Sequence, residues 1–196
     1  MFRPCPPTMP VPSRFAAARP VFLAAAITGT KIPFSVSVRN AQVTARPDSG
    51  RTALTGQPGT YALVLACRRT GTVRVGRLCS IELEPGFFMY VGSAFGPGGL
   101  GARVRHHRQI AANPHWHIDY LRARCDLVEV WFTADLARRE HSWAKAVGRM
   151  PGASIPLPGF GSSDCECDTH LFRFEAMPSI RAFRQRTRTT VTRYAL

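Results

Sequence analysis

The stretch from Phe87 to His107 constrains the fold of this chain more than any other. It reads as an apolar strand that ends at Gly92, followed by a glycine-rich turn and a helix that opens with small residues. In that helix Arg103 and His107 are four residues apart, so they lie on the same face. Polar side chains that follow a buried strand across a tight turn stand on a rigid edge. The stretch therefore predicts a site at one end of a β-sheet.

Other segments supply the rest of a small sheet and a second helix. The seven-residue apolar run 61–67 predicts a strand covered on both faces. Segments 73–78 and 81–83 predict a short hairpin, and 87–91, 127–132 and 171–174 predict further strands, the last at an edge. The first helix is expected over 99–112, before Asn113-Pro114, with Leu100, Val104 and Ala111 as its apolar stripe. The second is expected over 136–150, with Leu136, Trp143, Ala144 and Val147 on its buried face.

These elements predict an α/β (α+β) fold in which a small mixed, mainly antiparallel sheet is flanked by helices. The length of 196 residues suits one domain with a sizeable core. We place that domain at 56–175. Residues 1–55, rich in Pro, Ala and Arg, are expected to be a disordered basic extension, a presequence, or the result of a start codon assigned too far upstream. Residues 176–196 are expected to be a basic C-terminal tail.

The charge of the chain lies mainly in these two end segments. The formal net charge is +14, of which residues 1–55 carry +6, residues 56–175 carry +3 and residues 176–196 carry +5. Basic tails attract phosphate in a salt-dependent way. Only Lys31 and Lys145 are lysine, and such an arginine bias is also expected from GC-rich coding. The charge therefore allows a nucleic-acid partner without establishing one.

Cysteine and apolar patterns favour an intracellular location. Six cysteines in a chain of this length do not form the dense framework of a small secreted domain, so reduced thiols are expected. The longest apolar run, Val21 to Ile27, is too short to span a membrane. We expect a cytoplasmic protein with no membrane partner.

The predicted strands and helices bring a set of reactive side chains to one end of the sheet. If strands 61–67 and 87–91 pair antiparallel, the hydroxyls of Tyr61 and Tyr90 can lie at the same end. Glu140 falls on the core-facing side of the second helix, where a carboxylate needs a partner. Phosphodiester hydrolysis needs a group that takes a proton, positive charge on the phosphate, and a cation. Tyrosine, arginine and glutamate side chains offer these functions.

This set of residues resembles the signature of the GIY-YIG nuclease family over roughly 59–174. Gly59-Thr60-Tyr61 matches the first motif, Tyr90 and Gly92 match the second, Arg103 matches the helix arginine, and Glu140 matches the late glutamate. His107 stands where family members often carry histidine. The strings HWHIDYL (115–121) and PGFGSSDCECDTHL (158–171) look like the Uri-type branch, which is often described only as a domain of unknown function. Thr60 in place of isoleucine, the long spacing between the tyrosines, and Ser93-Ala94 depart from the family pattern.

The resemblance implies a metal-dependent endonuclease that acts on nucleic acid, with DNA as the expected substrate. Tyr61 would act as general base or position the water, with Tyr90 and His107 beside it. Arg103 would bind the scissile phosphate, and Glu140 would bind Mg²⁺ or Mn²⁺. Further contacts to the substrate are expected from four residues: Gly92, Ser93, Arg105 and His117.

A second polar cluster lies close to the end of the domain. Asp164, Cys165, Cys167 and His170 could hold Zn²⁺, but Cys-x-Cys is not the usual knuckle spacing and a fourth ligand would have to come from elsewhere in the chain. A hydrogen-bonded polar turn is the preferred interpretation. His115 and His117 alternate, so at most one is expected to face the site, and His106 and His141 are expected in solvent.

Two other functions remain open on the sequence alone. A non-catalytic nucleic-acid-binding module would use Arg103 and the basic tails to hold phosphate. A zinc-stabilised structural or interaction domain would depend on the cysteines. Neither would require Tyr61 and Glu140 to meet in one place.

Overall fold

The computed structural model describes residues 54–196, so the predicted extension 1–55 lies outside the described residues except for its last two. The elements follow in the order β1 (Thr60–Cys67), β2 (Gly71–Val75), β3 (Cys79–Leu83), β4 (Gly86–Ser93), α1 (Gly99–Arg108), α2 (His117–Arg122), β5 (Asp126–Thr133), α3 (Glu140–Gly148), β6 (Leu171–Phe174), α4 (Ile180–Thr187) and β7 (Thr192–Ala195).

Five strands form one sheet in the order β6-β4-β1-β5-β7, and β2 and β3 form a separate hairpin. Each pair of neighbouring strands in the described part of the chain is antiparallel. The prediction of an α+β fold around a small, mainly antiparallel sheet is confirmed, and the parallel pairing that a mixed sheet would include is not found among these strands. The predicted edge strand β6 lies at an edge.

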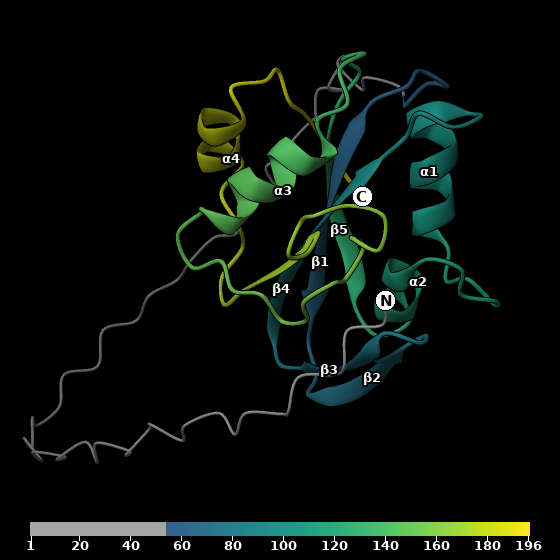
Figure 1. The fold of residues 1–196 in the computed structure, drawn as a ribbon, viewed down its shortest axis with the longest axis vertical. Helices are drawn as coiled ribbons and strands as arrows, with labels where there is room; N and C mark the ends of the chain where they lie inside the picture. Colours follow the sequence, from purple (N-terminus) through teal and green to yellow (C-terminus); the bar gives the residue numbers. More distant parts are fainter. Residues whose placement is uncertain (1–53) are drawn as a thin grey trace, which may run out of the picture. The chain divides into compact units, whose positions relative to one another are not determined.

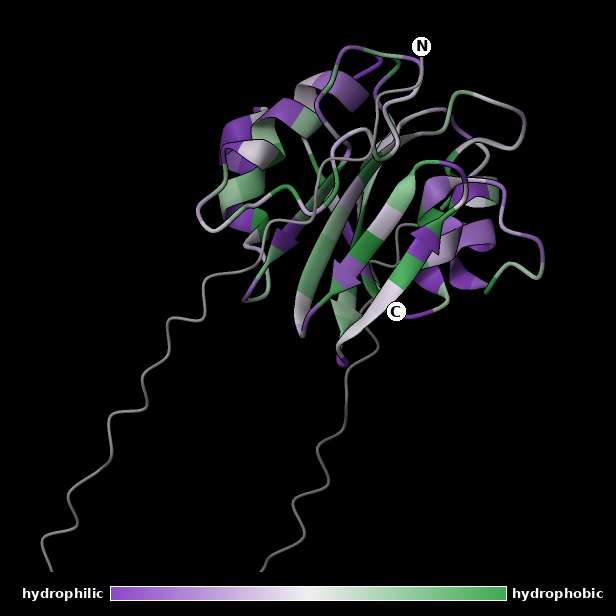
Figure 2. Ribbon diagram, turned by 60° about the horizontal axis from the view of Figure 1, so that its bottom comes forward, coloured by the Kyte–Doolittle hydropathy of each residue, from purple (hydrophilic) through white to green (hydrophobic). Residues whose placement is uncertain are grey.

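The apolar run in β1 is buried on both faces because its alternate side chains enter two cores. Tyr61, Leu63 and Leu65 pack with α1, α2 and the hairpin. Ala62 and Val64 pack on the other side with α3 and α4. Figure 1 shows α1 and α2 on one side of the sheet and α3 and α4 on the other. Figure 2 shows green strand residues between helices that carry many purple, hydrophilic ones.

Glycines at the start of α1 allow another part of the backbone to approach it closely. The N–H of Leu100 donates to the carbonyl of Gln57 (2.9 Å), and that of Gly101 donates to the carbonyl of Thr55 (2.7 Å). A Cβ atom on Gly99, whose φ is 53°, would lie 2.3 Å from the Gln57 oxygen. The segment before β1 therefore satisfies the first N–H groups of the helix, which would otherwise lack partners.

Both predicted helices begin or end at other residues than expected. α1 ends at Arg108, and Gln109 is already extended (φ −94°, ψ 152°). α3 begins only at Glu140, so Leu136 is 77% exposed instead of lying on a buried helix face. The carboxylate of Asp135 accepts the Ala137 N–H at 2.9 Å and pairs with Arg139. Such a side-chain bond to the backbone favours a turn over a helix start.

The prediction of a C-terminal tail after residue 175 is wrong. α4 and β7 belong to the folded unit: β7 pairs with β5, and Phe183 of α4 is fully buried between the rings of Trp131 (5.2 Å) and Trp143 (4.9 Å). These two large aromatic rings would lie exposed on β5 and α3 without this cover, which the hydrophobic effect disfavours.

The charge distribution changes with this correction. The +5 of residues 176–196 joins the +3 of residues 56–175, so the folded unit carries +8 instead of +3. No helix among residues 54–196 has the length and apolar character needed to cross a membrane.

Candidate functional site

A cleft of about 650 Å³ at one end of the sheet brings together the side chains for which chemistry was predicted. Tyr61, Tyr90, Arg103, His107 and Glu140 all line it. They come from β1, β4, α1 and α3, and they are separated by up to 79 positions in the chain. The tertiary fold thus brings Glu140, the most distant of them, to the same cavity as the other four.

The two tyrosines share the cleft because of the register of β1 and β4. Tyr61 lies opposite Gly92 and Leu63 lies opposite Tyr90, so the tyrosines are two positions apart along one face of the sheet. A Cβ atom on Gly92 would lie 2.5 Å from the Tyr61 ring, so only glycine leaves room for that ring. The structure thus gives Gly92 a packing role. Gly92 was predicted to contact the substrate, but it is not among the residues lining the cleft.

Tyr61 shares a hydrogen bond with His107, whose Nε2 atom lies 2.8 Å from the tyrosine hydroxyl. The two rings are tilted, with centroids 5.5 Å apart. His107 is buried, and its Nδ1 atom has no hydrogen-bond partner among the described residues. Burial, together with the nearby His106, lowers the pKa of His107 to about 3. The ring is therefore neutral at pH 7.

Both tyrosines are protonated in the free protein. Burial and the neighbouring Tyr90 raise the pKa of Tyr61 well above its ordinary value, although Arg103 acts to lower it. Burial and the carboxylate of Glu140 likewise raise the pKa of Tyr90. Each hydroxyl therefore enters the cleft as a neutral donor and acceptor.

Two arginines border the cleft from different elements. The guanidinium of Arg103 lies 4.3 Å from the centre of the Trp116 ring, and that of Arg138 lies 4.6 Å from the Phe95 ring. Among the described residues neither forms an ion pair with a carboxylate. Stacking on an aromatic ring orients a guanidinium and leaves its N–H groups available to an anion.

Arg138 was not predicted as a site residue, whereas Arg105 was. Arg138 lies in the turn before α3, which the sequence pattern assigned to the helix, and its role depends on how that turn folds. Arg105 is exposed on α1 and does not line the cleft. Two positions along a helix turn a side chain by more than half of the way around it, so Arg103 and Arg105 point in different directions.

Glu140 is the first residue of α3, and its side chain is 25% exposed. Its Oε1 atom lies 3.4 Å from Nδ1 of His170. The sequence analysis predicted that this carboxylate needs a partner, and the group beside it is a buried histidine. The same carboxylate also borders the cleft.

The histidines of the segment before β5 take different positions from those expected. His115 and His117 both line the cleft, because α2 begins at His117 and strand alternation does not apply there. The Gly161 N–H donates to Nδ1 of His117 at 3.0 Å, so the neutral ring carries its proton on Nε2. Burial lowers the pKa of His117. His106 is half-buried and lies 2.9 Å from the Asp119 carboxylate.

Asp119 stabilises the start of α2. Its carboxylate accepts the backbone N–H groups of His115 and Trp116, both at 3.0 Å. Burial acts to raise the pKa of Asp119, but these hydrogen bonds and the contact with His106 hold it below its ordinary value. Asp119 therefore has a structural role beside the cleft.

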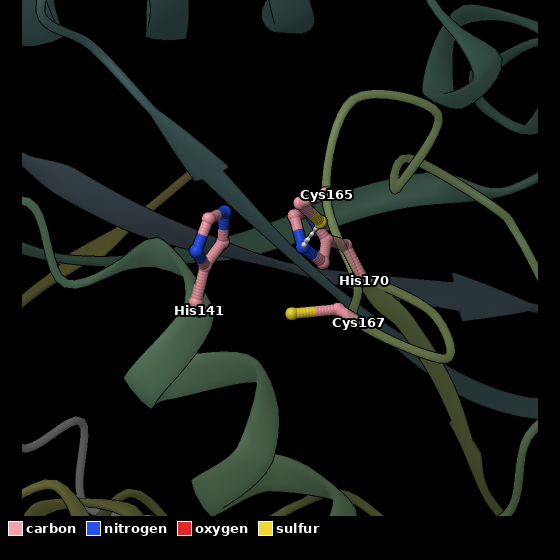
Figure 3. Close-up of side chains that lie close together, drawn as sticks. All are labelled: His141, Cys165, Cys167 and His170. Atoms are coloured by element: carbon pink, nitrogen blue, oxygen red, sulfur yellow. Dashed lines mark hydrogen bonds between the residues drawn. The ribbon is translucent and has the colours of Figure 1, made fainter.

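The second predicted cluster divides into two parts. Asp164 and the predicted substrate residue Ser93 line the cleft. Cys165, Cys167 and His170 instead lie next to His141, which projects from α3 (Figure 3). His141 was expected in solvent; its ring is exposed but lies 5.8 Å from the His170 ring. No spacing rule in the sequence connects His141 to the cysteines, because the contact depends on how α3 packs.

Another cleft of about 720 Å³ lies near the end of β5 and the connection between α4 and β7. It contains none of the predicted site residues. Its lining includes Asp135 and Arg139, which pair with each other. The chemistry predicted from the sequence is therefore located in the cleft at Tyr61.

A family model described as "Domain of unknown function DUF123" matches residues 60–192. This match covers more than half of the chain and includes every element from β1 to α4. The chain therefore belongs to the DUF123 family. No curated protein and no solved structure matches it.

Proposed function

We propose that this protein is a metal-dependent endonuclease of the GIY-YIG type that hydrolyses phosphodiester bonds in DNA or another nucleic acid. One observation carries the proposal. Two tyrosines, an arginine, a histidine and a glutamate, from four separate elements, line a single cleft. These side chains supply a proton acceptor, a phosphate ligand and a carboxylate, which the hydrolysis requires.

Tyr61 and His107 form the proton-accepting pair in this proposal. The Tyr61 hydroxyl accepts a proton from the attacking water and passes its own proton to Nε2 of His107, 2.8 Å away. The resulting hydroxide bonds to phosphorus, the bond from phosphorus to the leaving oxygen breaks, and that oxygen takes a proton from solvent. The negative charge of a bound phosphate would raise the pKa of the buried imidazole and favour this transfer.

Arg103 and Arg138 are the phosphate ligands. Both guanidinium groups border the cleft, each oriented by an aromatic ring, and neither is neutralised by a carboxylate among the described residues. Paired N–H groups match the geometry of phosphate oxygens. The net charge of +8 on the folded unit supports attraction of a polyanion over a longer range.

The carboxylates of the cleft fit a divalent cation. Glu140 is partly exposed on the cleft wall and Asp164 lies on the same lining, and hard cations such as Mg²⁺ or Mn²⁺ take oxygen ligands of this kind. When bound, such a cation would supply positive charge to the phosphate oxygens and lower the pKa of nearby hydroxyls. Glu140 is the residue expected to hold it.

The experiment that tests this function is a cleavage screen over duplex, branched and single-stranded DNA and over RNA. The purified chain is incubated with Mg²⁺ or Mn²⁺, with EDTA as control, and Tyr61→Phe and Glu140→Ala are assayed in parallel. We expect metal-dependent nicking that both variants lose. Cleavage that continues unchanged in both variants would come from a contaminant or another site. Binding that persists in EDTA, with no cleavage of any substrate, would favour a non-catalytic nucleic-acid-binding module.

A further inference from the structure

The side chains of His141, Cys165, Cys167 and His170, here called the Cys/His cluster, converge outside the cleft. One ligand atom from each lies within 4.8 Å of the other three. Figure 3 shows His141 projecting from α3 toward the two cysteines and His170, which lie on the loop before β6. Two segments separated by more than twenty residues thus bring two thiols and two imidazoles together.

We propose that the Cys/His cluster binds a structural zinc ion. Two cysteine sulfurs and two histidine nitrogens form a donor set typical of structural zinc sites. Soft sulfur ligands with imidazole favour zinc over the hard cations that carboxylates bind. This site is separate from the cleft, and the proposal stands whether or not the cleft is catalytic.

The distances between the ligand atoms of the Cys/His cluster are close to those of a zinc site, and bound zinc would shorten the longer ones. With Zn–S near ~2.3 Å and Zn–N near ~2.1 Å, neighbouring ligand atoms of a tetrahedron lie about 3.4 to 3.8 Å apart. Sγ of Cys165 and Nε2 of His170 are already 3.4 Å apart. All four ligand atoms lie within 4.8 Å of one another, so tetrahedral distances need shifts of at most about 1.4 Å, a size that small side-chain rotations supply.

His170 carries a second observation that points to a ligand. The ring is 1% exposed, and its Nδ1 atom makes no hydrogen bond although Glu140 Oε1 is 3.4 Å away. Histidines that bind a metal through one nitrogen usually donate the other N–H to a carboxylate or carbonyl. Zinc on Nε2 would place the proton on Nδ1 and draw it toward Glu140, which gives the buried nitrogen a partner.

The position of the cluster explains why the fold would need such a ligand. Between the end of α3 and the start of β6, residues 149–170 form turns, bends and a single bridge at Ser154, with no helix or strand. Long segments of this kind are uncommon in compact domains. Zinc would tie the end of this loop to α3. The same loop carries Gly161, Ser163 and Asp164 into the cleft.

Metal analysis of the full-length chain tests the proposal. The untagged protein is produced with zinc in the medium and purified under reducing conditions without chelator, and its zinc is measured by mass spectrometry. We expect about one zinc per chain, and less than about a tenth of this in a Cys165→Ser/Cys167→Ser variant. Cobalt supplied in place of zinc should give the absorption bands of tetrahedral cobalt with thiolate ligands.

Matched variants keep the test independent of folding. His141→Ala removes an exposed side chain and is expected to weaken zinc binding while circular dichroism shows a folded protein. His115→Ala, an exposed histidine outside the Cys/His cluster, should retain zinc. A wild-type chain with no zinc and no tetrahedral cobalt spectrum would overturn the proposal. Zinc that remains at the wild-type level in the double cysteine variant would also overturn it. So would a Cys165–Cys167 disulfide in protein freshly purified under reducing conditions.

Discussion

Glu140 lies between two sites, because its Oε1 atom is 3.4 Å from Nδ1 of His170 while the same side chain borders the cleft with Tyr61 and Tyr90. One carboxylate therefore contacts the Cys/His cluster on one side and the candidate active site on the other. In our proposals it holds a divalent cation and also orients a histidine that binds zinc. The two roles can be separated by experiment.

Glu140→Gln should separate them. The amide keeps the size of the side chain but removes the charge that a hard cation requires. We expect metal-dependent cleavage to fall about 100-fold or more, while zinc content stays near that of the wild type. Glu166→Gln, an exposed residue between the two cysteines, is the matched control and should cleave normally. Cleavage by Glu140→Gln at the wild-type rate would remove Glu140 from the active site.

Arg103 and Arg105 provide a second matched pair. Of these two, Arg103 lines the cleft, whereas Arg105 is exposed on another side of α1. Arg103→Ala should lower kcat/KM for cleavage by about 100-fold, because it removes charge-assisted hydrogen bonds to the phosphate. Arg105→Ala should change it by less than about threefold at moderate salt. Equal losses in the two variants would mean that general positive charge, and not a placed guanidinium, matters.

We expect position 92 to require glycine because the Tyr61 ring packs against it. Gly92→Ala would place a Cβ atom 2.5 Å from the Tyr61 ring, so the ring or the strand must move, at a cost of about 1–3 kcal/mol in the free energy of unfolding. Gly71→Ala on β2 meets no atom within 4 Å and should change stability by less than about 1 kcal/mol. Urea unfolding of both variants measures the difference, and equal stability would contradict the packing role.

His107 should make stability depend on pH. Its pKa is about 3 in the folded chain and about 6.5 when unfolded. The unfolded chain binds the extra proton between these values, so stability is lost as pH falls below about 6.5. Between pH 7 and pH 5 we expect the wild type to lose about 2 kcal/mol more than His107→Gln. Urea unfolding at both pH values measures this; losses of equal size would show that His107 does not remain neutral when folded.

Phe183 tests whether residues after 175 belong to the domain. Phe183→Ala should lower the free energy of unfolding by about 3–5 kcal/mol, because the buried ring packs between two tryptophans. Arg181→Ala, exposed on the same helix, should have an effect below about 0.5 kcal/mol. Thermal or urea unfolding compares them. A Phe183→Ala protein as stable as the wild type would restore the interpretation of this segment as a tail.

Local patterns were sufficient to predict strands β1 to β6 and the orientation of side chains along them, while β7 lies in the segment that was expected to be a tail. The alternation of β1 and β4 places Tyr61 and Tyr90 on one face because side chains in a strand alternate with a period of two. The helical period places Arg103 and His107 on one side of α1. The helical relation follows from backbone geometry over a few residues, whereas the placement of the two tyrosines at one end of the sheet also required the antiparallel pairing of β1 with β4.

Helix boundaries and the C-terminal segment were not predictable in the same way. The turn at Asp135 competes with the helix start through a side-chain bond that the apolar period does not record. The burial of Phe183 depends on Trp131 and Trp143, which lie more than thirty residues earlier. A basic, Thr-rich segment looks like a tail until the surface that it covers is known.

What the sequence by itself determined is which residues can carry the chemistry and how neighbours are oriented along each strand and helix. Only the tertiary structure decided that Glu140 reaches the cleft, that Arg138 and not Arg105 borders it, and that His141 joins the cysteines. The physical reason is that local orientation is set by backbone dihedral angles. Contacts between segments that are distant in the sequence are set by how strands and helices pack to bury their apolar faces.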